Sequence, residues 1–328
     1  MKALVYDGPE QLGFRDVPDP VAGPGQQLIR VEAVGICGSD MHAYLGHDER
    51  RPASLILGHE AAGTIVGGPR DGERVTLNPL VTCGTCPACL SGKDNLCPTR
   101  MIISMPPREG AFAQFVTMRD ENLVTVPDDI SLAKASLAEP IGCGWHTVRL
   151  ARQALGRDGN ALVIGGGAIG LGAALSLTAQ GITDVTVLEP NAVRRAYLIE
   201  SCGQNAIAPD DLAASALFDI VIDGVGYAAT RATASAHARP GGVIGHIGLG
   251  EATGGLDIRR MTLQEITFIG TYTYTAQDFR DTAAAIFNGR LGPLDWTEAR
   301  PLADGAAAFA DIRAGRTAAP KIVLEPHS

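Results

Sequence analysis

The chain has 328 residues, a length typical of two domains. Its 36 Asp and Glu residues against 27 Lys and Arg residues give a net charge of −9, which argues against nucleic acid as a partner. Hydrophobic residues make up 45% of the chain, enough for large cores and too many for a disordered protein. The N-terminus lacks a signal peptide, and glycines interrupt the uncharged stretch 160–183. We therefore expect a cytoplasmic protein without a membrane segment.

Short apolar runs separated by Gly and Pro fill the chain up to about residue 135. Examples are residues 27–34, 61–66 and 113–117, and brief strands of this spacing predict a compact β-rich barrel or sandwich. The stretch 132–155 is rich in Ala, Leu and Arg and predicts a helix, which we expect Pro140 and the nearby glycines to interrupt.

From residue 161 onward, apolar runs alternate with helical patterns. This alternation predicts a parallel sheet covered by helices on both faces. The predicted strands are 161–164, 185–188, 220–222, 243–247 and 266–269, and the first two predicted helices are 168–180 and 191–202. A helix over 276–289 and a strand over 321–324 follow, and they do not extend this unit in an obvious way.

A glycine-rich motif follows the strand 161–164. Gly165, Gly167 and Gly170, with Ala168 and Ile169 between the last two, match G-x-G-x-x-G. The three glycines respectively allow a tight turn, a close approach to a pyrophosphate and close packing of helix on sheet. Glu189 follows the second strand, where an acid can hold the ribose hydroxyls of a dinucleotide. The motif in this context predicts a dinucleotide site.

Four cysteines crowd into a turn-rich segment, at positions 83, 86, 89 and 97. Four thiolates are the ligand set of a closed, structural zinc site. An iron–sulfur cluster can use the same ligands, but the spacing favours zinc. With seven cysteines in the whole chain, a metal site in a reducing compartment is a better interpretation than a disulfide scaffold. We expect Cys83, Cys86, Cys89 and Cys97 to bind this zinc.

A second set of metal-binding residue types is dispersed along the first half of the chain. It comprises Cys37, His59, Glu60 and Glu139. One thiolate, one imidazole and one or two carboxylates can hold a catalytic zinc with an open position for substrate. Spacing alone leaves open that these are ordinary structural residues.

Taken together, these segments resemble the zinc-dependent medium-chain alcohol dehydrogenase family, in particular its sorbitol/polyol, butanediol and threonine dehydrogenase branch. The resemblance covers essentially the whole chain, from the Cys37-Gly38-Ser39-Asp40 loop to the glycine-rich motif. It implies an α/β fold: a Rossmann doubly wound parallel sheet over 139–274 and a β-rich GroES-like catalytic domain. The catalytic domain is expected over 1–138, with 275–328 returning to it and the active site in the cleft between the domains.

The same resemblance implies roles for individual residues. Cys37 and His59 are expected to bind a catalytic zinc, with Glu60 and Glu139 as alternative carboxylate ligands and Cys143 as a weaker candidate. Asp40 resembles the acid that orients the ligand histidine. Ser39 and His42 resemble a relay that carries the alcohol proton through the nicotinamide ribose to solvent.

The cofactor side follows in the same way. By the resemblance, the backbone around Val225 and around Ile247, Gly248 and Leu249 is expected beside the nicotinamide. Apart from the resemblance, Arg194 and Arg195 fall one turn into the helix after Glu189, where they are expected to cover the adenine or to stay solvated. Because Glu189 would repel a 2′-phosphate, NAD rather than NADP is the expected cofactor. The resemblance therefore predicts an NAD-dependent secondary-alcohol or polyol dehydrogenase with two zinc ions per chain, acting as a homodimer or homotetramer.

Alternatives remain open at this point. A quinone reductase of the same superfamily is one, although such enzymes usually lack both zinc sites. A non-catalytic protein that docks a partner through the four-cysteine lobe and an inactive scaffold are others. The charged loop 46–51 is interpreted either as a solvated surface loop or as a rim that selects polar substrates. Within the alcohols, the substrate itself is left open.

Overall fold

The computed structural model describes residues 1–328, which form two compact units. The first unit comprises Met1–Glu139, Phe279–Asn288 and Thr297–Ser328. The second comprises Pro140–Asp278 and Gly289–Trp296. The second unit is thus inserted into the chain of the first. It includes 275–278 and 289–296, which are predicted in the catalytic domain, whereas Glu139, predicted in the Rossmann domain, lies in the first unit.

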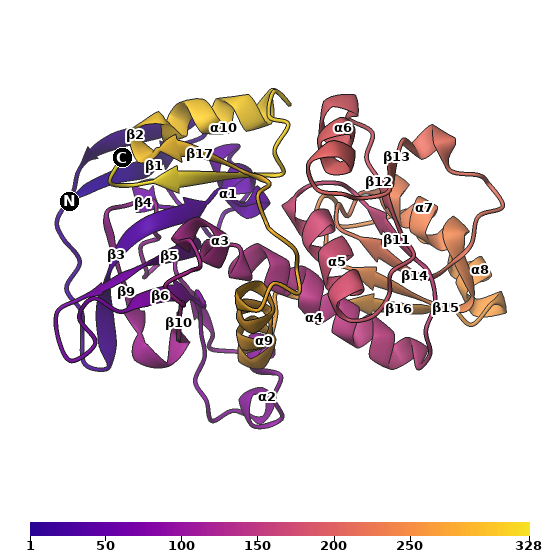
Figure 1. The fold of residues 1–328 in the computed structure, drawn as a ribbon, viewed down its shortest axis with the longest axis horizontal. Helices are drawn as coiled ribbons and strands as arrows, with labels where there is room; N and C mark the ends of the chain where they lie inside the picture. Colours follow the sequence, from indigo (N-terminus) through magenta and orange to yellow (C-terminus); the bar gives the residue numbers. More distant parts are fainter. The chain divides into compact units, whose positions relative to one another are not determined.

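A seven-stranded sheet forms the centre of the first unit (Figure 1). Its order is β10-β6-β5-β3-β18-β17, and β9 also pairs with β3. The strands are β3 (Gln26–Gly35), β5 (Glu60–Val66), β6 (Arg74–Leu77), β9 (Phe115–Arg119), β10 (Leu123–Thr125), β17 (Thr297–Pro301) and β18 (Lys321–Glu325). The antiparallel pairing of β18 with β3 brings the C-terminal strand next to one of the first strands of the chain.

Smaller elements complete this unit. Two short sheets consist of β2 (Gln11–Asp16), β1 (Lys2–Gly8) and β4 (Leu55–Ile56), and of β7 (Leu80–Val81) and β8 (Met101–Ile102). The helices that lie mostly in this unit are α1 (Gly38–Tyr44), α2 (Pro87–Leu90), α3 (Leu132–Ser136), α9 (Ala276–Phe287) and α10 (Gly305–Arg313).

The core of the first unit follows from the two-residue period of its strands. In β3, Ile29 and Val31 are fully buried while Arg30 between them is exposed, because successive side chains of a strand point to opposite faces. Phe112 and Phe309 fill the same apolar cluster, with their rings edge to face at 5.9 Å. This core fixes the strands from which the candidate site residues project.

The second unit contains a six-stranded sheet in which every pairing is parallel. The order β13-β12-β11-β14-β15-β16 is that of a doubly wound dinucleotide-binding fold. Figure 1 shows α5 and α7 on opposite sides of these strands. The strands are β11 (Ala161–Ile164), β12 (Val185–Leu188), β13 (Ala206–Ile207), β14 (Phe218–Asp223), β15 (Ala238–His246) and β16 (Thr267–Gly270). The helices are α4 (Ala138–Leu155), α5 (Ala168–Ala179), α6 (Ala192–Glu200), α7 (Ala228–His237) and α8 (Ile258–Leu263). The predicted fold class is confirmed.

Some predicted boundaries were wrong. Pro140 does not interrupt α4, because it lies in the first turn, where a backbone N–H has no partner within the helix in any case. The break comes earlier, at Leu137, between α3 and α4. Residue 113 precedes β9, which begins at Phe115, and forms only an isolated bridge to Ala3. None of the helices combines the length and the hydropathy of a membrane-spanning segment.

Candidate catalytic and dinucleotide sites

The start of α1 gathers the first group of candidate residues. Cys37 is the N-cap of this helix, and its backbone N–H donates to Asp40 Oδ2 at 3.0 Å. Asp40 is fully buried, and its other oxygen accepts from the N–H of Gly58 at 3.2 Å. One carboxylate therefore ties the Cys37 loop to the Gly58-His59-Glu60 segment.

The imidazole of His59 is surrounded by polar groups on both of its nitrogens. Its Nδ1 lies 3.5 Å from Asp40 Oδ1 and 3.3 Å from Ser104 Oγ. Its Nε2 lies 3.5 Å from Ser39 Oγ. The ring is buried, so these contacts, together with packing, determine its orientation. Asp40 thus lies where an acid can fix the tautomer of a metal-binding histidine.

Glu60 begins β5 and is fully buried. Its Oε1 forms an ion pair with Lys321 Nζ at 2.6 Å, and Lys321 also donates to the carbonyl oxygen of Ile36. Its Oε2 is buried without any hydrogen-bond partner. Because a buried carboxylate oxygen without a partner is costly, this atom is a candidate to bind a cation.

The donor set fits a metal ion. The ligand atoms of Cys37, His59 and Glu60 all lie within 4.8 Å of one another. Burial lowers the pKa of His59, but the negative charges of Asp40 and Cys37 outweigh burial and hold that pKa well above its usual range. The charges that favour a proton on this imidazole would equally favour a divalent cation beside it. Thiolate, imidazole and carboxylate together are zinc ligands.

The other predicted residues are placed as follows. Glu139 is buried in the first turn of α4, outside the group of three. Burial lowers the pKa of Lys321, but the negative charges of Glu60, Cys37 and Glu139 raise it above its usual value, so Glu139 lies in the same electrostatic environment. Cys143 lies further along α4 and outside the group. His42 is exposed on α1, with its ring 6.4 Å from that of His47 and no hydrogen bond to Ser39.

Three residues that surround this group could not be identified from the sequence: Arg51, Ser104 and Lys321. Arg51 belongs to the charged loop 46–51, of which His47, Glu49 and Arg50 are exposed while Arg51 is 3% exposed. The loop is therefore solvated on one side only. Lys321 carried a weak signal in the sequence, as a lysine that opens an apolar strand, but nothing local links it to Glu60.

The four-cysteine lobe lies between β7 and β8. Three of its sulfur pairs are 3.5–3.9 Å apart: Cys83–Cys89, Cys86–Cys89 and Cys83–Cys97. A tetrahedral zinc with bonds of about 2.3 Å separates its sulfurs by about 3.8 Å, so the spacing fits. Hydrogen bonds from the backbone of Thr85 and Cys86 and from the Thr85 hydroxyl lower the pKa of Cys83 to about 5, which favours the thiolate. None of the seven cysteines forms a disulfide.

The glycine-rich motif of the second unit joins β11 to α5. Gly165 has φ +97°, a conformation that favours glycine, and Gly167 is the N-cap of α5. A Cβ on Gly170 would lie 1.7 Å from the carbonyl oxygen of Gly165, so only glycine fits there. A Cβ on Gly167 would meet no atom within 4 Å, which leaves the backbone open to a ligand. Ala168 and Ile169 form the first turn of α5, whose amides can face a diphosphate.

Glu189 lies directly after β12, close to this motif. Its Oε2 accepts from the N–H of Gly166 at 2.9 Å, and its Oε1 accepts from the N–H of Asn191 at 2.7 Å. A carboxylate has further acceptor sites, so both oxygens can still accept from ribose hydroxyls. Arg194 is in the first turn of α6, and Arg195 donates to the carbonyl oxygen of Glu189.

The residues expected beside the nicotinamide also lie at the carboxyl ends of strands. Gly226 and Gly248 pack backbone to backbone, since a Cβ on Gly248 would come within 2.4 Å of Gly226 N. The N–H groups of Ile247 and Gly248 donate to the carbonyl oxygen of Asp223, and Val225 N–H donates to the Asp223 carboxylate. Leu249 is 77% exposed and lines a cavity of about 380 Å³ with Gly248, His246, Arg231 and Phe268.

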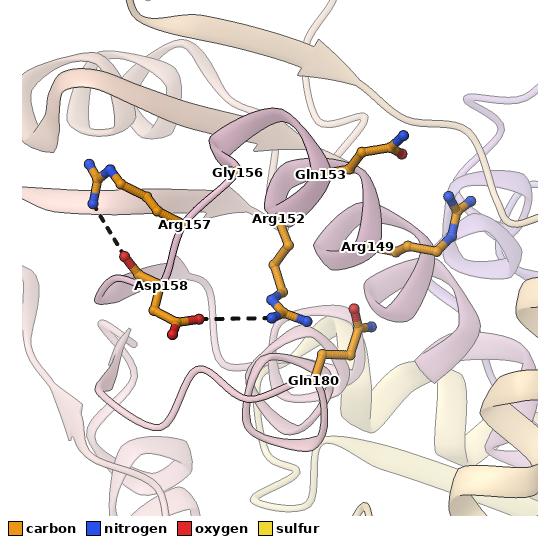
Figure 2. Close-up of a pocket in the computed structure, with 7 residues that line it drawn as sticks. All are labelled: Arg149, Arg152, Gln153, Gly156, Arg157, Asp158 and Gln180. Atoms are coloured by element: carbon orange, nitrogen blue, oxygen red, sulfur yellow. Dashed lines mark hydrogen bonds and ion pairs between the residues drawn. The ribbon is translucent and has the colours of Figure 1, made fainter.

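A second cavity of about 380 Å³ lies at the C-terminal end of α4, and none of the predicted residues lines it. Figure 2 shows Arg152 extending from α4 between Gln180 and Asp158, with an ion pair to Asp158 at 4.0 Å. The other two arginines that line this cavity also form ion pairs: Arg149 with Asp278 and Arg157 with Asp219. The lining residues are Arg149, Arg152, Gln153, Gly156, Arg157, Asp158 and Gln180.

Two family models match the chain. Residues 23–128 match the alcohol dehydrogenase GroES-like domain, and residues 168–288 match the zinc-binding dehydrogenase domain. The first match contains Cys37, His59, Glu60 and the four-cysteine lobe, and the second contains Gly170 and Glu189.

Individual proteins are similar over most of the chain. Sorbitol dehydrogenase of Bacillus subtilis is 34% identical over 269 residues, which cover 76% of this chain and 75% of that protein. A probable D-xylulose reductase A of Neosartorya fischeri is 28% identical over 96% of this chain and 94% of its own length. The structure of acetophenone reductase from Geotrichum candidum in complex with NAD matches with a TM-score of 0.85 and 26% identity, covering 99% and 96% of the two chains.

Proposed function

Because the chain belongs to the zinc-dependent medium-chain alcohol dehydrogenase family, we propose that it oxidises a secondary alcohol group of a polyol, or reduces the matching ketone, at the Cys37–His59–Glu60 site. At the level of reaction class, it is a zinc-type, NAD-dependent alcohol or polyol oxidoreductase. The observation that supports the location of the reaction is the buried Oε2 of Glu60, which has no partner beside a thiol and an imidazole.

Cys37, His59 and one carboxylate, Glu60 or Glu139, would hold the catalytic zinc. When bound, the zinc lowers the pKa of an alcohol oxygen, so that its proton leaves near neutral pH. Ser39 would accept that proton, since its Oγ lies beside the ring of His59. His42, exposed on the same helix, would pass it to water. Asp40 would keep His59 in one tautomer throughout.

The second unit would hold the cofactor. Gly165, Gly167 and the first amides of α5 would bind the diphosphate, and Glu189 would bind the ribose. NAD bound there would supply the acceptor for the hydride, which carries two electrons and one proton from the alcohol carbon. The second proton, from the alcohol oxygen, would leave through Ser39 and His42. The backbone around Val225 and Ile247 would position the nicotinamide.

The rest of the proposal concerns composition and assembly. We expect two zinc ions per chain, one catalytic and one bound by Cys83, Cys86, Cys89 and Cys97. Seven cysteines without a disulfide suit a reducing compartment, which supports a cytoplasmic location. A homodimer or homotetramer is the expected assembly, and analytical ultracentrifugation tests it.

Formation of NADH from a panel of alcohols tests the proposed reaction. The panel contains polyols, vicinal diols, hydroxy amino acids and simple secondary alcohols. We expect turnover with the polyols or diols and loss of that turnover in the zinc-free protein. A zinc-loaded protein that turns over no alcohol or ketone with either nicotinamide cofactor would contradict the proposal and favour a binding role for the lobe.

We expect a preference for NAD over NADP of at least about tenfold in kcat/KM. Glu189 would face the 2′-phosphate of NADP, and repulsion between charges about 4 Å apart costs roughly 1–4 kcal/mol, where 1.4 kcal/mol is tenfold. Glu189→Ala should narrow the preference, mainly by improving the use of NADP. Arg194→Gln is the control, which should leave the preference for NAD in place. Equal use of both cofactors by the unmodified enzyme would contradict the prediction and point to Arg194 and Arg195.

A further inference from the structure

Arg51 is a buried cation beside the candidate catalytic site. Its Nε donates to the carbonyl oxygen of Ser104 at 3.0 Å, and one terminal nitrogen donates to Asp48 Oδ2 at 2.6 Å. The same nitrogen lies 3.4 Å from the carbonyl oxygen of Ser39, and the other lies 3.4 Å from Ser39 Oγ. One guanidinium thus contacts both serines whose hydroxyls lie beside His59.

We propose that Arg51, held by Asp48, is a positioning residue that keeps Ser39 and Ser104 on opposite nitrogens of the His59 imidazole. The inference rests on the proposed function and adds to it a residue outside the ligand and relay set. Arg51 itself acts only through the two serines.

The energetic argument starts from the cost of burial. An arginine side chain that is 1% exposed needs a compensating charge, and Asp48, 9% exposed, supplies it. A surface loop does not need such a pair, because both charges would be better solvated in water. We attribute the burial of the Arg51–Asp48 ion pair to the other contacts of the guanidinium, which are with Ser39 and Ser104.

The choice of arginine follows from geometry. A guanidinium carries five N–H donors in a fixed plane and can contact several acceptors in different directions at once. Here it links the loop to α1 through Ser39 and to the segment after β8 through Ser104. A lysine would keep the charge but would concentrate its donors at one point. The orientation of His59, and of the Ser39 hydroxyl beside it, would therefore depend on the guanidinium plane.

The test compares Arg51→Gln with Arg50→Gln. Both arginines bond to Asp48, but the Arg50 side chain is 63% exposed and its bonds to Asp48 do not reach either serine. We expect Arg51→Gln to lower kcat about ten- to hundredfold with the KM for NAD unchanged, because charged hydrogen bonds are the strong ones. Arg50→Gln should keep the kcat of the unmodified enzyme. Equal effects of the two substitutions would overturn the proposal.

Two further measurements separate positioning from general stability. In a double-mutant cycle, Ser104→Ala should cost less in the Arg51→Gln background than alone, since Arg51 acts through Ser104. Additive effects would overturn the proposal. If Arg51→Gln does not fold, Arg51→Lys keeps the charge beside Asp48, and we expect it to fold with a reduced kcat; the kcat of the unmodified enzyme in this variant would also overturn the proposal.

Ring ¹⁵N chemical shifts of His59 in the zinc-loaded protein provide a readout independent of turnover. They should change in Arg51→Gln and Arg51→Lys but not in Arg50→Gln. If the unmodified protein oxidises no alcohol, the proposed function fails while these shifts still test Arg51. Shifts that stay the same in all three variants would reject the role of Arg51 and leave the proposed function intact.

Discussion

Cys37→Ala and His59→Ala should each remove nearly all dehydrogenase activity, by at least about 10³-fold, while the protein stays folded. A catalytic metal contributes several kcal/mol to the transition state, and each 1.36 kcal/mol is tenfold in rate. Loss of either ligand leaves a site that cannot hold zinc against chelation. Steady-state kinetics, zinc analysis and circular dichroism on the same samples check the three parts of this expectation.

His42→Ala should reduce activity much less than loss of either zinc ligand. The His42 ring is exposed, so water can replace it in carrying the proton. We expect activity to fall about tenfold, below the 10²–10⁴-fold typical of general acid–base groups. The loss should become smaller as the pH rises, because more hydroxide is then available to accept the alcohol proton in place of the ring, and a pH profile of kcat measures this dependence. If His42→Ala is as inactive as Cys37→Ala at every pH, the assignment of the relay is wrong.

Removal of zinc from the four-cysteine lobe should affect stability rather than chemistry. Structural zinc contributes on the order of 10 kcal/mol to folding in small zinc-binding peptides. Cys97→Ser should therefore lower the zinc content from two ions to one per chain and unfold the lobe. Cys202→Ser, which changes a cysteine outside both clusters, should keep two ions. Thermal unfolding and metal analysis of the two variants measure the difference.

The two ions should also differ in lability. A catalytic ion with an open coordination position, as proposed for Cys37 and His59, should leave first under mild chelation, with loss of activity and no change in circular dichroism. The lobe ion, enclosed by four sulfurs, should leave later and together with secondary structure. Metal analysis that finds one ion or none in carefully prepared protein would contradict the expected stoichiometry. Unfolding of the lobe before activity falls would contradict the expected order.

The sequence predicted features whose physical cause is local. The Gly165–Gly170 turn could be predicted because the positive φ of Gly165 and the contact of Gly170 with the Gly165 carbonyl oxygen are both constraints within a few residues. The clustering of Cys83, Cys86, Cys89 and Cys97 could be predicted because the four residues are close in the chain. The fold class followed from the change in hydrophobic period after residue 135. Each of these features can be predicted without knowledge of tertiary contacts.

The features that could not be predicted depend on partners distant in the chain. Pro140 looked like a helix breaker because its position in the first turn depends on where α4 begins. Arg51 looked exposed because a charged loop gives no sign of which side chain turns inward. Lys321 and Glu60 meet only because β18 pairs with β3 and β3 with β5. The local sequence pattern does not indicate which residues of β18, β3 and β5 lie next to one another.

The return of the C-terminal strand to the first unit has a consequence for biosynthesis. The partner of Glu60 is Lys321, so a chain still being translated lacks the cation that neutralises this carboxylate until residue 321 has emerged. The inserted second unit, complete at Trp296, can fold while β18 is still missing. The nascent protein would therefore acquire its dinucleotide-binding fold before the proposed metal site at Cys37, His59 and Glu60 is complete. A metal ion would bind at that site only after the second unit has formed.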